Sequence, residues 1–489
     1  MKKICLCFQI HQPYRFRRYR FFDIGSPYHD YQDDRLNQDI FEQIAHECYL
    51  PANQMMLELL RAYPDFRISY SISGLAIEQM EEYMPQLFTS FQELVATGRV
   101  ELVAAPYAHS LASLYDFKEF KNQIRLQQER LHHLFGVAPS KVLCNTGLIY
   151  SDDIALMLRE MGLKGVLTEG AKHVLGWKSP NYLYHAATNP DCKLLLRNAA
   201  LSEYISKDFG RYDHPDFPIT ADKLISRVQA LPNGEEHTVL YMNYETLGMA
   251  HRSESGIFDF FRALPMLAAQ GAVGFATPSE LVEGKSVGEL KVSYPISSSG
   301  EEKSTHEWMG NILQQGAIEK LRELCERVHL IHDSRLLQDW LSLQSSDHFF
   351  YMSDQGSRGF SPYSSPYDAF NNYMNVLSDF MLRVDKLVPR DIDLPILNDY
   401  EQTISNQGEE LKTLKRRIKE LEGQLAEAKP NVPSAASQST VAASTATPAS
   451  KVAKSKTKAD KVTEGSEAPQ TKTTKAKRKS TAKSEKSKV

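Results

Sequence analysis

The sequence predicts an α/β fold: an incomplete TIM-like (β/α)7 barrel followed by a helical bundle. Three observations predict it. Apolar strand-like runs alternate with amphipathic helical segments over residues 1–285, which is typical of a parallel sheet buried on both faces. Seven such units occur, with a possible eighth at "AVGFA" (272–276). From residue 308 to 384 the pattern is helical throughout, so we assign a bundle domain to 286–390.

Each predicted strand is a short apolar run, and the segments between the strands repeat apolar residues every three or four positions. The strands are "KICLCFQI" (3–10), "FRISYSIS" (66–73), "VELVAA" (100–105), "KVLCN" (141–145), "GVLTE" (165–169), "KLLLRN" (193–198) and "TVLYMN" (238–243). Helical patterns include 41–63 and 84–98 in the barrel, then 308–331, 334–344 and 367–384. The later helices are expected to pack against the barrel.

The first residues, "MKKICLCFQIHQP", resemble a secretory signal because two lysines precede apolar residues. The apolar stretch is short, Gln9 and His11 interrupt it, and no small-residue cleavage site follows. We interpret it as the first core strand. The six cysteines form no zinc-type spacing, and no run approaches the roughly 20 apolar residues of a membrane helix. We therefore expect a cytoplasmic protein with reduced cysteines and no membrane contact.

A heptad pattern follows the predicted bundle. Apolar residues between 396 and 428 are spaced alternately three and four apart, which predicts a coiled coil. They include Leu397, Tyr400, Ile404, Leu411, Leu414, Ile418, Leu421 and Leu425. Gly408 and Gly423 weaken the pattern. We expect a homo-oligomer joined through this segment, and the alternative is a lone helix docked on its own domain.

Residues 429–489 form a basic tail. It carries 14 Lys and Arg against 4 Asp and Glu, so residues 1–428 have a net charge of −14 although the total is −4. The tail has no Leu, Ile, Met or aromatic residue, cannot bury enough apolar area to offset its ordering entropy, and is predicted to be disordered. Its lysines suit an anionic partner such as nucleic acid, and a solvated tail without a binding role is the other interpretation.

Polar and aromatic side chains follow the predicted strands, at the end where α/β barrels carry their active sites. Sugar rings stack on aromatic rings and hydrogen-bond at their edges, so this chemistry suits a saccharide. The barrel contributes His11, Gln12, Glu78, His109, Glu169, Lys172, His173, Trp177, Tyr182, Asn243, Tyr244 and Glu245, and the helical region adds Asp347 and His348. Ordinary roles compete, since a lone His often only hydrogen-bonds and a lone Glu often caps a helix.

Several short motifs occur in order over about residues 1–385. They are "HQP", "HSLASL", "NTGLIYSDDIA", "LTEGAKHVLGWKSPNYLY", "LLLRN", "MNYETLG", "ESGIFDFFRALP", "SDHFFYM" and "SPYDAFNNYMNVLSDF". Through them the chain resembles glycoside hydrolase family 57, in particular its α-amylase branch. The resemblance implies a (β/α)7 barrel, a following helical bundle and α-1,4-glucan as the substrate class. It also implies a Glu nucleophile after strand four, an Asp acid after strand seven, and neither metal nor organic cofactor.

Three strand ends depart from the pattern of that family. The family has Glu where "NTGLIYSD" has Gly147, Asp where "MNYET" has Asn243, and Glu where "APYAHSL" has Ala105. The resemblance therefore implies that the nucleophile and the proton donor are lost. A retaining glycosidase needs two carboxyl groups about 5–5.5 Å apart. An amide is no acid, although Asn243 can still hydrogen-bond a sugar hydroxyl.

Three hypotheses follow. The first is a protein that binds α-1,4-glucan or maltooligosaccharide without efficient hydrolysis, whose cleft is wider at Gly147 by one Glu side chain. Restoring Glu and Asp at the two positions should then return trace hydrolysis. The second is an active retaining α-amylase or 4-α-glucanotransferase that uses substitute carboxylates, with Asp152, Asp153, Glu169 and Glu245 as candidates. The third is an oligomeric scaffold in which the barrel is only a platform.

Overall fold

The computed structural model describes residues 1–354, 360–389, 414, 415 and 417 of the 489-residue chain. The chain divides into two compact units, Met1–Ser405 and Asn406–Val489. In the second unit the described residues, Leu414, Lys415 and Arg417, are helical. Apart from these three, the predicted coiled coil and basic tail lie outside the described residues, so both stay predictions.

Seven parallel strands form a closed ring within the described residues, which confirms the predicted (β/α)7 barrel. Strand β1 pairs with β2 and β8, β2 pairs with β3, β4 with β5, β5 with β7, and β7 with β8. Hydrogen bonds from Ala104 N to Val142 O (3.0 Å) and from Cys144 N to Ala104 O (2.7 Å) join β3 to β4. The strands are β1 (Lys2–Ile10), β2 (Ile68–Ile72), β3 (Val100–Leu102), β4 (Val142–Cys144), β5 (Gly165–Glu169), β7 (Lys193–Arg197) and β8 (His237–Asn243).

Three further short strands extend this sheet. The possible eighth unit, "AVGFA", forms β9 (Val273–Phe275), which pairs only with the first residues of β1 and does not enter the ring. Strand β6 (Tyr184–Ala186) runs antiparallel to β7, and β10 (Gly288–Leu290) runs parallel to β6. The sheet therefore continues past residue 285, into the segment that we assigned to the bundle.

The side chains of β1 alternate between two cores, as the period of a strand requires. Leu6 and Phe8 pack outward with the helices, in a cluster that includes Tyr70 and Phe261. Cys5 and Cys7 face inward, in a cluster with other barrel residues: Val103, Val142, Cys144, Leu167, Leu195 and Val239. All six cysteines are free and buried, so the inward pair serves as small apolar filling.

Helices surround the ring. They are α1 (Asp34–Ile44), α2 (Leu50–Ala62), α3 (Gly74–Tyr83), α4 (Pro85–Ala96), α5 (Phe117–Phe135), α6 (Asp152–Glu160), α7 (Lys172–Leu175), α8 (Ala199–Ser206), α9 (Ala221–Gln229), α10 (Ile257–Gln270) and α11 (Pro278–Val282). The pattern at 41–63 is interrupted by a π-helical stretch, Ala45–Tyr49, between α1 and α2. Pro51 lacks an N–H for the carbonyl four residues earlier, which accounts for the altered hydrogen bonding there.

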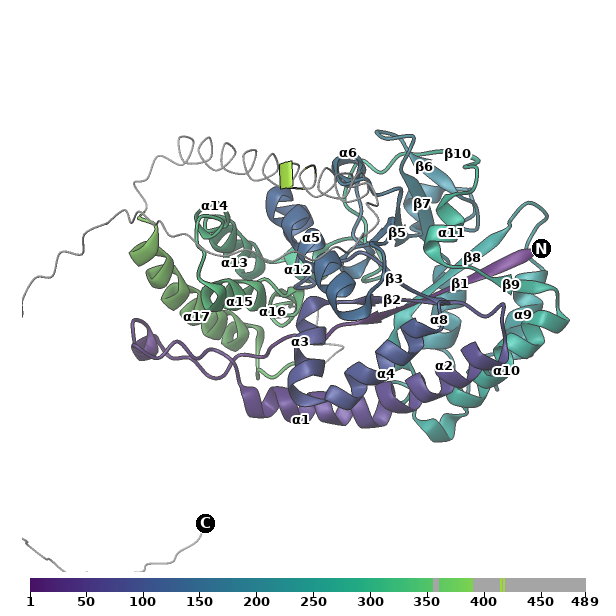
Figure 1. Cartoon of the computed structure of the whole chain (residues 1–489), viewed down its shortest axis with the longest axis horizontal. Helices are drawn as coiled ribbons and strands as arrows, with labels where there is room; N and C mark the ends of the chain where they lie inside the picture. The colour runs from purple at the N-terminus through teal and green to yellow at the C-terminus, as the bar shows by residue number, and fades with distance from the viewer. Residues whose placement is uncertain (355–359, 390–413, 416, 418–489) are drawn as a thin grey trace, which may run out of the picture. The chain divides into compact units, whose positions relative to one another are not determined.

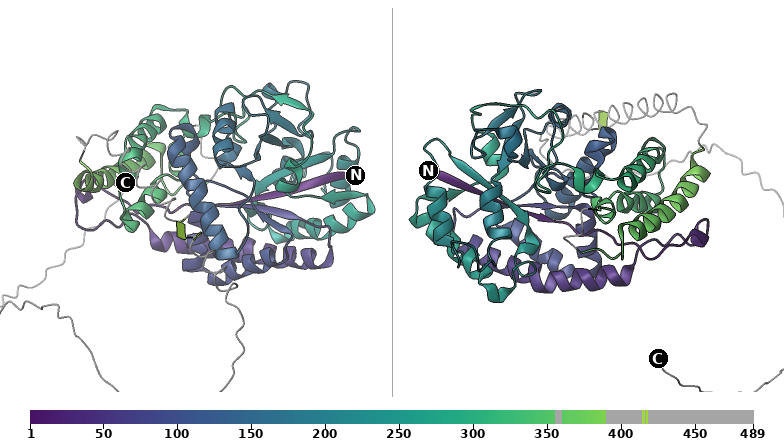
Figure 2. Two further views of the ribbon diagram at one scale, coloured as in Figure 1. Left: turned by 45° about the horizontal axis from the view of Figure 1, so that its top comes forward. Right: turned by 180° about the vertical axis from the view of Figure 1, so that it is seen from behind.

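The predicted bundle is also present, and it lies at the end of the barrel toward which β1 runs (Figures 1 and 2). Its helices are α12 (His306–Met309), α13 (Ile312–Arg322), α14 (Cys325–Val328), α15 (Ser334–Leu343), α16 (Ser346–Phe350) and α17 (Pro366–Leu387). An isolated antiparallel bridge joins Ser110, beyond β3, to Ser345, just before α16. The bundle thus brings its own side chains to the carboxyl ends of the barrel strands.

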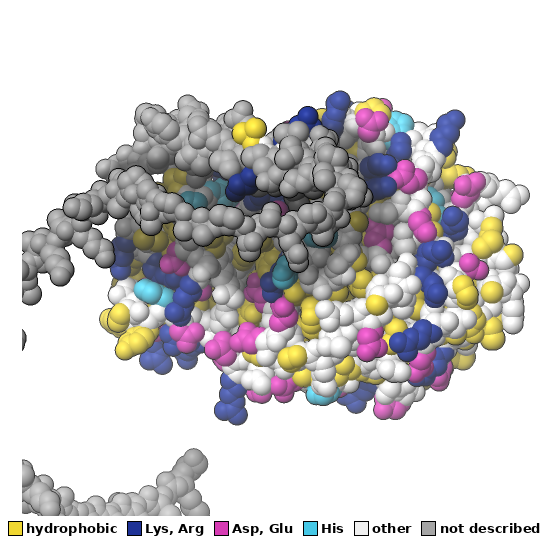
Figure 3. All heavy atoms as spheres, viewed as in Figure 1, with side chains coloured by type: hydrophobic (Ala, Val, Ile, Leu, Met, Phe, Trp, Pro, Cys, Tyr) yellow, Lys and Arg dark blue, Asp and Glu magenta, His cyan; other side chains and the backbone are white. Residues whose placement is uncertain are grey.

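The surface of the described residues mixes charges of both signs. Figure 3 shows Lys and Arg interspersed with Asp and Glu over the face in view, with apolar side chains scattered between them. Among the described residues, no helix combines the length and the apolar character needed to cross a bilayer.

Candidate functional site

Three polar side chains from separate elements meet at the carboxyl end of the barrel. His11 follows β1, His109 lies in the loop after β3, and Asp347 belongs to α16 of the bundle. The His11 Nε2 atom lies 2.9 Å from Asp347 Oδ2, and the His11 and His109 rings stack with centroids 4.2 Å apart. We call these residues the His–Asp cluster. The sequence named all three, and the fold brings them together from positions 336 residues apart.

Neighbouring hydroxyl groups hold both rings of the cluster. His11 Nδ1 lies 2.8 Å from Ser73 Oγ, and His109 Nδ1 lies 3.0 Å from Ser346 Oγ. Burial and the nearby His11 lower the pKa of His109, so its imidazole is neutral at pH 7. Burial alone would raise the pKa of Asp347, but the adjacent His11 imidazole outweighs it and holds that pKa well below its usual range. The cluster therefore presents one carboxylate beside a neutral ring.

The same three residues are a possible metal ligand set, because one donor atom from each lies within 4.8 Å of the others. The ring geometry does not fit an ion. The lone pair of an imidazole nitrogen lies in the ring plane, and the two rings stack with only 26° between their planes. Their lone pairs cannot meet at one point unless a ring turns, and the Gln9 amide nitrogen already contacts His109 Nε2. The four ring nitrogens already lie within hydrogen-bonding distance of Ser73, Asp347, Ser346 and Gln9, so the Asp347 carboxylate is the group of the cluster that can accept from a ligand hydroxyl.

A cavity of about 330 Å³ opens beside the ends of β7 and β8. Its lining includes Arg197, Asn243, Glu245 and Ser298. Asn243 is the last residue of β8 and its side chain is exposed, so the amide is available to a ligand. We call this space the β8 cavity.

Tyr244 and Glu245, the two residues after Asn243, lie in different surroundings. Tyr244 turns into the core, where its hydroxyl donates to Asn53 Oδ1 at 2.9 Å and accepts from Tyr70 at 3.1 Å. Glu245 lies in the 3₁₀ turn Tyr244–Thr246 and lines the β8 cavity. The Glu245 carboxylate accepts from Gln12 Nε2 at 3.2 Å and from the Tyr49 hydroxyl. Burial raises the pKa of Glu245.

An ion-pair network borders the β8 cavity. Arg197 Nη1 lies 2.9 Å from Glu169 and 3.7 Å from Glu203, and Lys303 Nζ lies 3.4 Å from Glu203. Burial raises the pKa of Glu169 even though Arg197 counteracts it, and one Glu169 oxygen is buried without a hydrogen-bond partner among the described residues. Glu169 is therefore a carboxyl group that can hold a proton at higher pH than usual.

Gly147 lies in the 3₁₀ turn Thr146–Leu148 with a φ of 53°, in the left-handed region. A Cβ built on it would lie 2.5 Å from the Cη2 atom of Trp308, which is only 7% exposed. The expectation of a wider cleft at this position is therefore wrong, because the indole from α12 packs where a side chain would begin. Ser298 adds hydrogen bonds from its N (2.8 Å) and Oγ (3.0 Å) to the Gly147 carbonyl.

Ala105, the third departure from the family pattern, is buried after β3, and its N–H donates to Gln127 Oε1 at 3.3 Å. Asp152 and Asp153 open α6, and Asp152 Oδ2 accepts from Val292 N at 2.9 Å. Asp152 therefore binds the segment that precedes the bundle and makes a structural contact.

Other predicted residues lie away from the His–Asp cluster. Glu78 is in α3, where it accepts from the Tyr107 hydroxyl at 2.6 Å and where burial raises its pKa. His348 is buried, stacks on Phe16 with centroids 4.2 Å apart, and has a pKa that burial lowers to about 4. Both serve the packing beneath the site.

The aromatic loop after β5 also lies away from the His–Asp cluster. Trp177 is 92% exposed, and Lys172 and His173 face solvent. Tyr182 lines a separate cavity of about 370 Å³ beside Lys3, near the start of β1, and His237, the first residue of β8. Asn181 fixes the loop there, because its amide nitrogen donates to Glu235 at 2.6 Å and its oxygen accepts from Asn198 at 3.0 Å.

Some of the functional residues that the sequence analysis missed had a local signal. Arg197 stands in the quoted motif "LLLRN", so its place at a strand end was visible. Trp308 gave none, since nothing local connects it with Gly147. Ser73, Ser345 and Ser346 support the His–Asp cluster only through the fold.

Comparison with known proteins gives the family. Residues 5–295, which include the ring apart from the first three residues of β1, match the sequence profile of Glycosyl hydrolase family 57. The chain belongs to glycosyl hydrolase family 57. The resemblance drawn from the motifs is thereby confirmed.

Two curated relatives carry amylase names. A putative α-amylase of Methanocaldococcus jannaschii is 35% identical over 403 residues, which cover 78% of this chain and 85% of that protein. An α-amylase of Pyrococcus abyssi is 26% identical over 199 residues, which cover 41% of this chain and 29% of that protein. The first similarity extends through the barrel and beyond it.

Solved structures of family 57 enzymes share the fold. A branching enzyme of Thermococcus kodakaraensis matches with a TM-score of 0.58 and 14% identity, covering 82% of this chain and 94% of that chain. A 4-α-glucanotransferase of Thermococcus litoralis matches with a TM-score of 0.55 and 14% identity, covering 77% of this chain and 60% of that chain. At this identity the likeness establishes the architecture alone.

Proposed function

We propose that this family 57 protein binds α-1,4-glucan chains at the carboxyl end of its barrel and does not hydrolyse them efficiently. The observation that carries the proposal is the contact between Trp308 and Gly147. Where the family resemblance expects the nucleophile, there is no carboxylate, and an indole fills the space of its side chain.

A polar surface supports the binding half of the proposal. The β8 cavity offers the exposed Asn243 amide, and the His–Asp cluster offers a carboxylate next to stacked imidazole rings. The Asn243 amide both donates and accepts hydrogen bonds, and the Asp347 carboxylate accepts them, so together they suit the hydroxyl groups of a sugar. Glucose units are the substrate class implied by the family.

The chemistry of retaining glycosidases supports the second part of the proposal, the absence of efficient hydrolysis. A retaining mechanism needs a carboxylate to form the glycosyl ester and a second carboxyl group to transfer the proton. Loss of a nucleophile costs about 10⁶ in turnover by analogy with a serine protease, which corresponds to about 8 kcal/mol of barrier. Binding is affected less, because the hydrogen-bonding groups lie elsewhere.

One observation favours a second candidate, an active α-amylase or 4-α-glucanotransferase with substitute carboxylates. Glu245 lines the β8 cavity beside Asn243, and burial raises its pKa, as a general acid requires. Glu169 has a raised pKa too, but it is tied to Arg197. Neither residue replaces the nucleophile at Gly147, so we rank this candidate second.

The test measures binding and products together. Purified protein is titrated with maltoheptaose by calorimetry, and the same mixture is analysed for shorter oligosaccharides after long incubation. We expect saturable binding without products, and binding at least tenfold weaker in Asp347→Ala. Products that disappear in Glu245→Gln would establish the second candidate, and the absence of binding would favour a scaffold.

We also propose that residues 396–428 join copies of this chain, in a protein located in the cytoplasm. Pairing of apolar a and d residues would drive the association. Light scattering should give a larger mass for a chain ending at residue 429 than for one ending at 391. Equal masses would remove the coiled coil from this account.

A further inference from the structure

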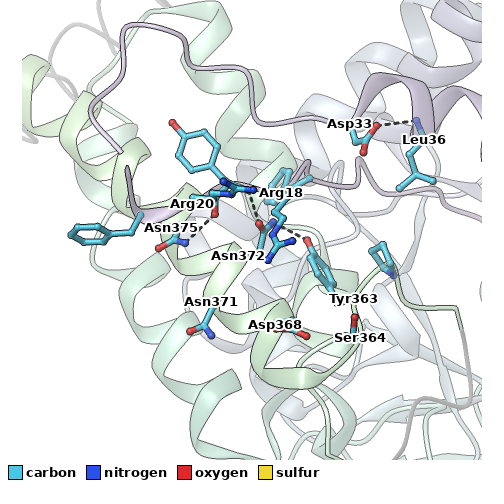
Figure 4. Close-up of a pocket in the computed structure, with 14 residues that line it drawn as sticks. Arg18, Arg20, Asp33, Leu36, Tyr363, Ser364, Asp368, Asn371, Asn372 and Asn375 are labelled. Atoms are coloured by element: carbon cyan, nitrogen blue, oxygen red, sulfur yellow. Dashed lines mark hydrogen bonds between the residues drawn. The ribbon is translucent and has the colours of Figure 1, made fainter. Parts of the chain in front are cut away.

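We propose that the protein has a second saccharide site, in a cavity between α17 and the segment that precedes α1. This segment, residues 13–33, is called the arm. The cavity has a volume of about 590 Å³, within the usual range for ligand pockets. It is shown in Figure 4. The ligand class rests on the proposed glucan binding, whereas the location of the second site does not depend on it.

One face of α17 forms a wall of this arm cavity. Asp368, Asn371, Asn372 and Asn375 are spaced as i, i+3, i+4 and i+7, so they share a side of the helix. Figure 4 shows these four residues along α17, with Arg18 on the arm facing them. Three neighbouring amides and a carboxylate make this face unusually rich in groups that both bind and orient hydroxyls.

Part of this face fixes the arm. Tyr19 N donates to Asn372 Oδ1 at 2.7 Å, and Asn375 Nδ2 donates to the Tyr19 carbonyl at 3.0 Å. Farther along the helix, Asp379 accepts from Gly25 N at 2.6 Å and from the Tyr31 hydroxyl at 2.6 Å. The two walls are therefore held apart at a set distance, which preorganises the cavity.

Other groups in the cavity are free to bind. Within the part of the chain that the structure describes, the Arg18 and Asn371 side chains make no hydrogen bond or ion pair, and both are exposed. Arg18 supplies donors, and the Asn371 amide supplies a donor and an acceptor. Phe21, which is exposed, and Tyr363 add aromatic surface to the same lining. Stacking surface beside free planar polar groups is the chemistry that recognises a sugar ring.

The charge of the lining favours a neutral ligand over an anion. Two arginines, Arg18 and Arg20, are matched by two carboxylates, Asp33 and Asp368, so the formal charge of the cavity wall is zero. A phosphate site would need an excess of positive charge or bidentate arginines left without acidic neighbours. The balance points to a polyhydroxylated, uncharged chain such as an α-glucan.

The arm cavity is distinct from the barrel site, although one residue connects them. Phe16 lines the arm cavity and stacks on His348, which follows Asp347 of the His–Asp cluster. The Phe16 ring thus lies between the two sites as a wall. Because a long glucan could reach both, a short ligand is needed to count them separately.

The test is calorimetry with maltotriose on the full chain. The arm variant is Arg18→Ala with Asn371→Ala, and the barrel variant is Asp347→Ala. Arg262→Ala is the control, since Arg262 is another exposed arginine, on α10 and outside the lining of the arm cavity. We expect two molecules bound per wild-type chain, one per arm variant, one per barrel variant, and two per control.

The remaining outcomes separate the two claims, saccharide binding at the barrel and saccharide binding in the arm cavity. One molecule bound, unaffected by the arm variant but lost in the barrel variant, would overturn the second site and leave the proposed function. One molecule lost only in the arm variant would support the arm cavity and overturn binding at the barrel. No binding would overturn both. Binding of inorganic phosphate in place of maltotriose, abolished by Arg18→Ala, would overturn the saccharide assignment.

Discussion

The two sides of the barrel mouth differ at the two positions where the motif resemblance expects a carboxylate. After β4, Gly147 is covered by the Trp308 indole, and the space of the side chain is filled. After β8, Asn243 is exposed and borders a cavity of about 330 Å³. Relative to the family pattern, the first change removes a whole side chain, and the second exchanges an oxygen for a nitrogen.

The difference follows from packing. A missing side chain at a crowded strand end leaves a void, and voids in close-packed interiors are costly, so a neighbour moves in. Replacing Asp by Asn conserves volume, and the surroundings need not adjust. The Gly147 side is therefore packed like a core, whereas the Asn243 side borders an open cavity.

The largest expected effect is that of Trp308→Ala. Removing a buried indole should cost about 3–5 kcal/mol in the free energy of unfolding. Trp177→Ala is the matched control, because Trp177 is 92% exposed and its loss should change stability by less than about 0.5 kcal/mol. Urea unfolding of both variants checks this. Equal effects would mean that Trp308 does not fill the Gly147 side.

Restoring the carboxylates should fail for a steric reason. In Gly147→Glu with Asn243→Asp, the new Cβ meets Trp308 at 2.5 Å on a backbone with φ 53°. Overpacking costs about 1–3 kcal/mol, and a left-handed residue adds about 1–2 kcal/mol. The structure thus changes the expectation drawn from the sequence: we expect a lower melting temperature and no hydrolysis.

Adding Trp308→Gly to that pair should regain stability relative to the double variant and return trace hydrolysis of maltoheptaose. Thermal unfolding and product analysis measure both. Hydrolysis by the double variant, without Trp308→Gly, would show that the indole moves aside easily. The space beside Gly147 would then be accessible to a new side chain.

Asp347→Asn should have a moderate, pH-dependent effect on the stability of the fold, through the His–Asp cluster. The pKa of Asp347 is lowered in the fold, so its contribution is full above the ordinary Asp pKa and is lost as the pH falls below about 4. We expect a loss of about 1–2 kcal/mol at pH 7, because the side chain is 28% exposed and its bond to His11 is charge-assisted. The gap between wild type and variant, followed by urea unfolding, should narrow at pH 3. A gap that is constant with pH would contradict the ion pair.

Asn243→Asp should have the smallest effect. The side chain is exposed and the exchange conserves volume, so the free energy of unfolding should change by less than about 0.5 kcal/mol. Thermal unfolding at pH 7 checks this. A loss above 1 kcal/mol would show that the amide is part of a packed network, as Gly147 is.

The elements that could be predicted from the sequence are those with local signals. The ring strands were visible because each is a continuous apolar run, and the bundle because its apolar residues recur at helical spacing. His11, His109 and Asp347 were each predicted, since strand ends and a motif marked them, and the fold explains why they meet.

Other placements depend on contacts that no local pattern reveals. Tyr244 was expected to bind ligand, but it lies in the 3₁₀ turn after β8 and its hydroxyl donates to Asn53 in the core. Tyr182 sits beside the start of β8 because the amide of Asn181 ties its loop there. Trp308 reaches Gly147 from the bundle, across 161 positions of sequence, and only the packed structure shows it.

The most direct test of the central claim is the turnover of maltoheptaose labelled at its reducing end. Wild type and Asp347→Ala are purified side by side and incubated at equal concentration, so that any contaminating amylase gives the same rate in both. The account predicts saturable binding by wild type and no labelled product above the rate of the variant. Product formed by wild type and abolished in the variant would contradict it.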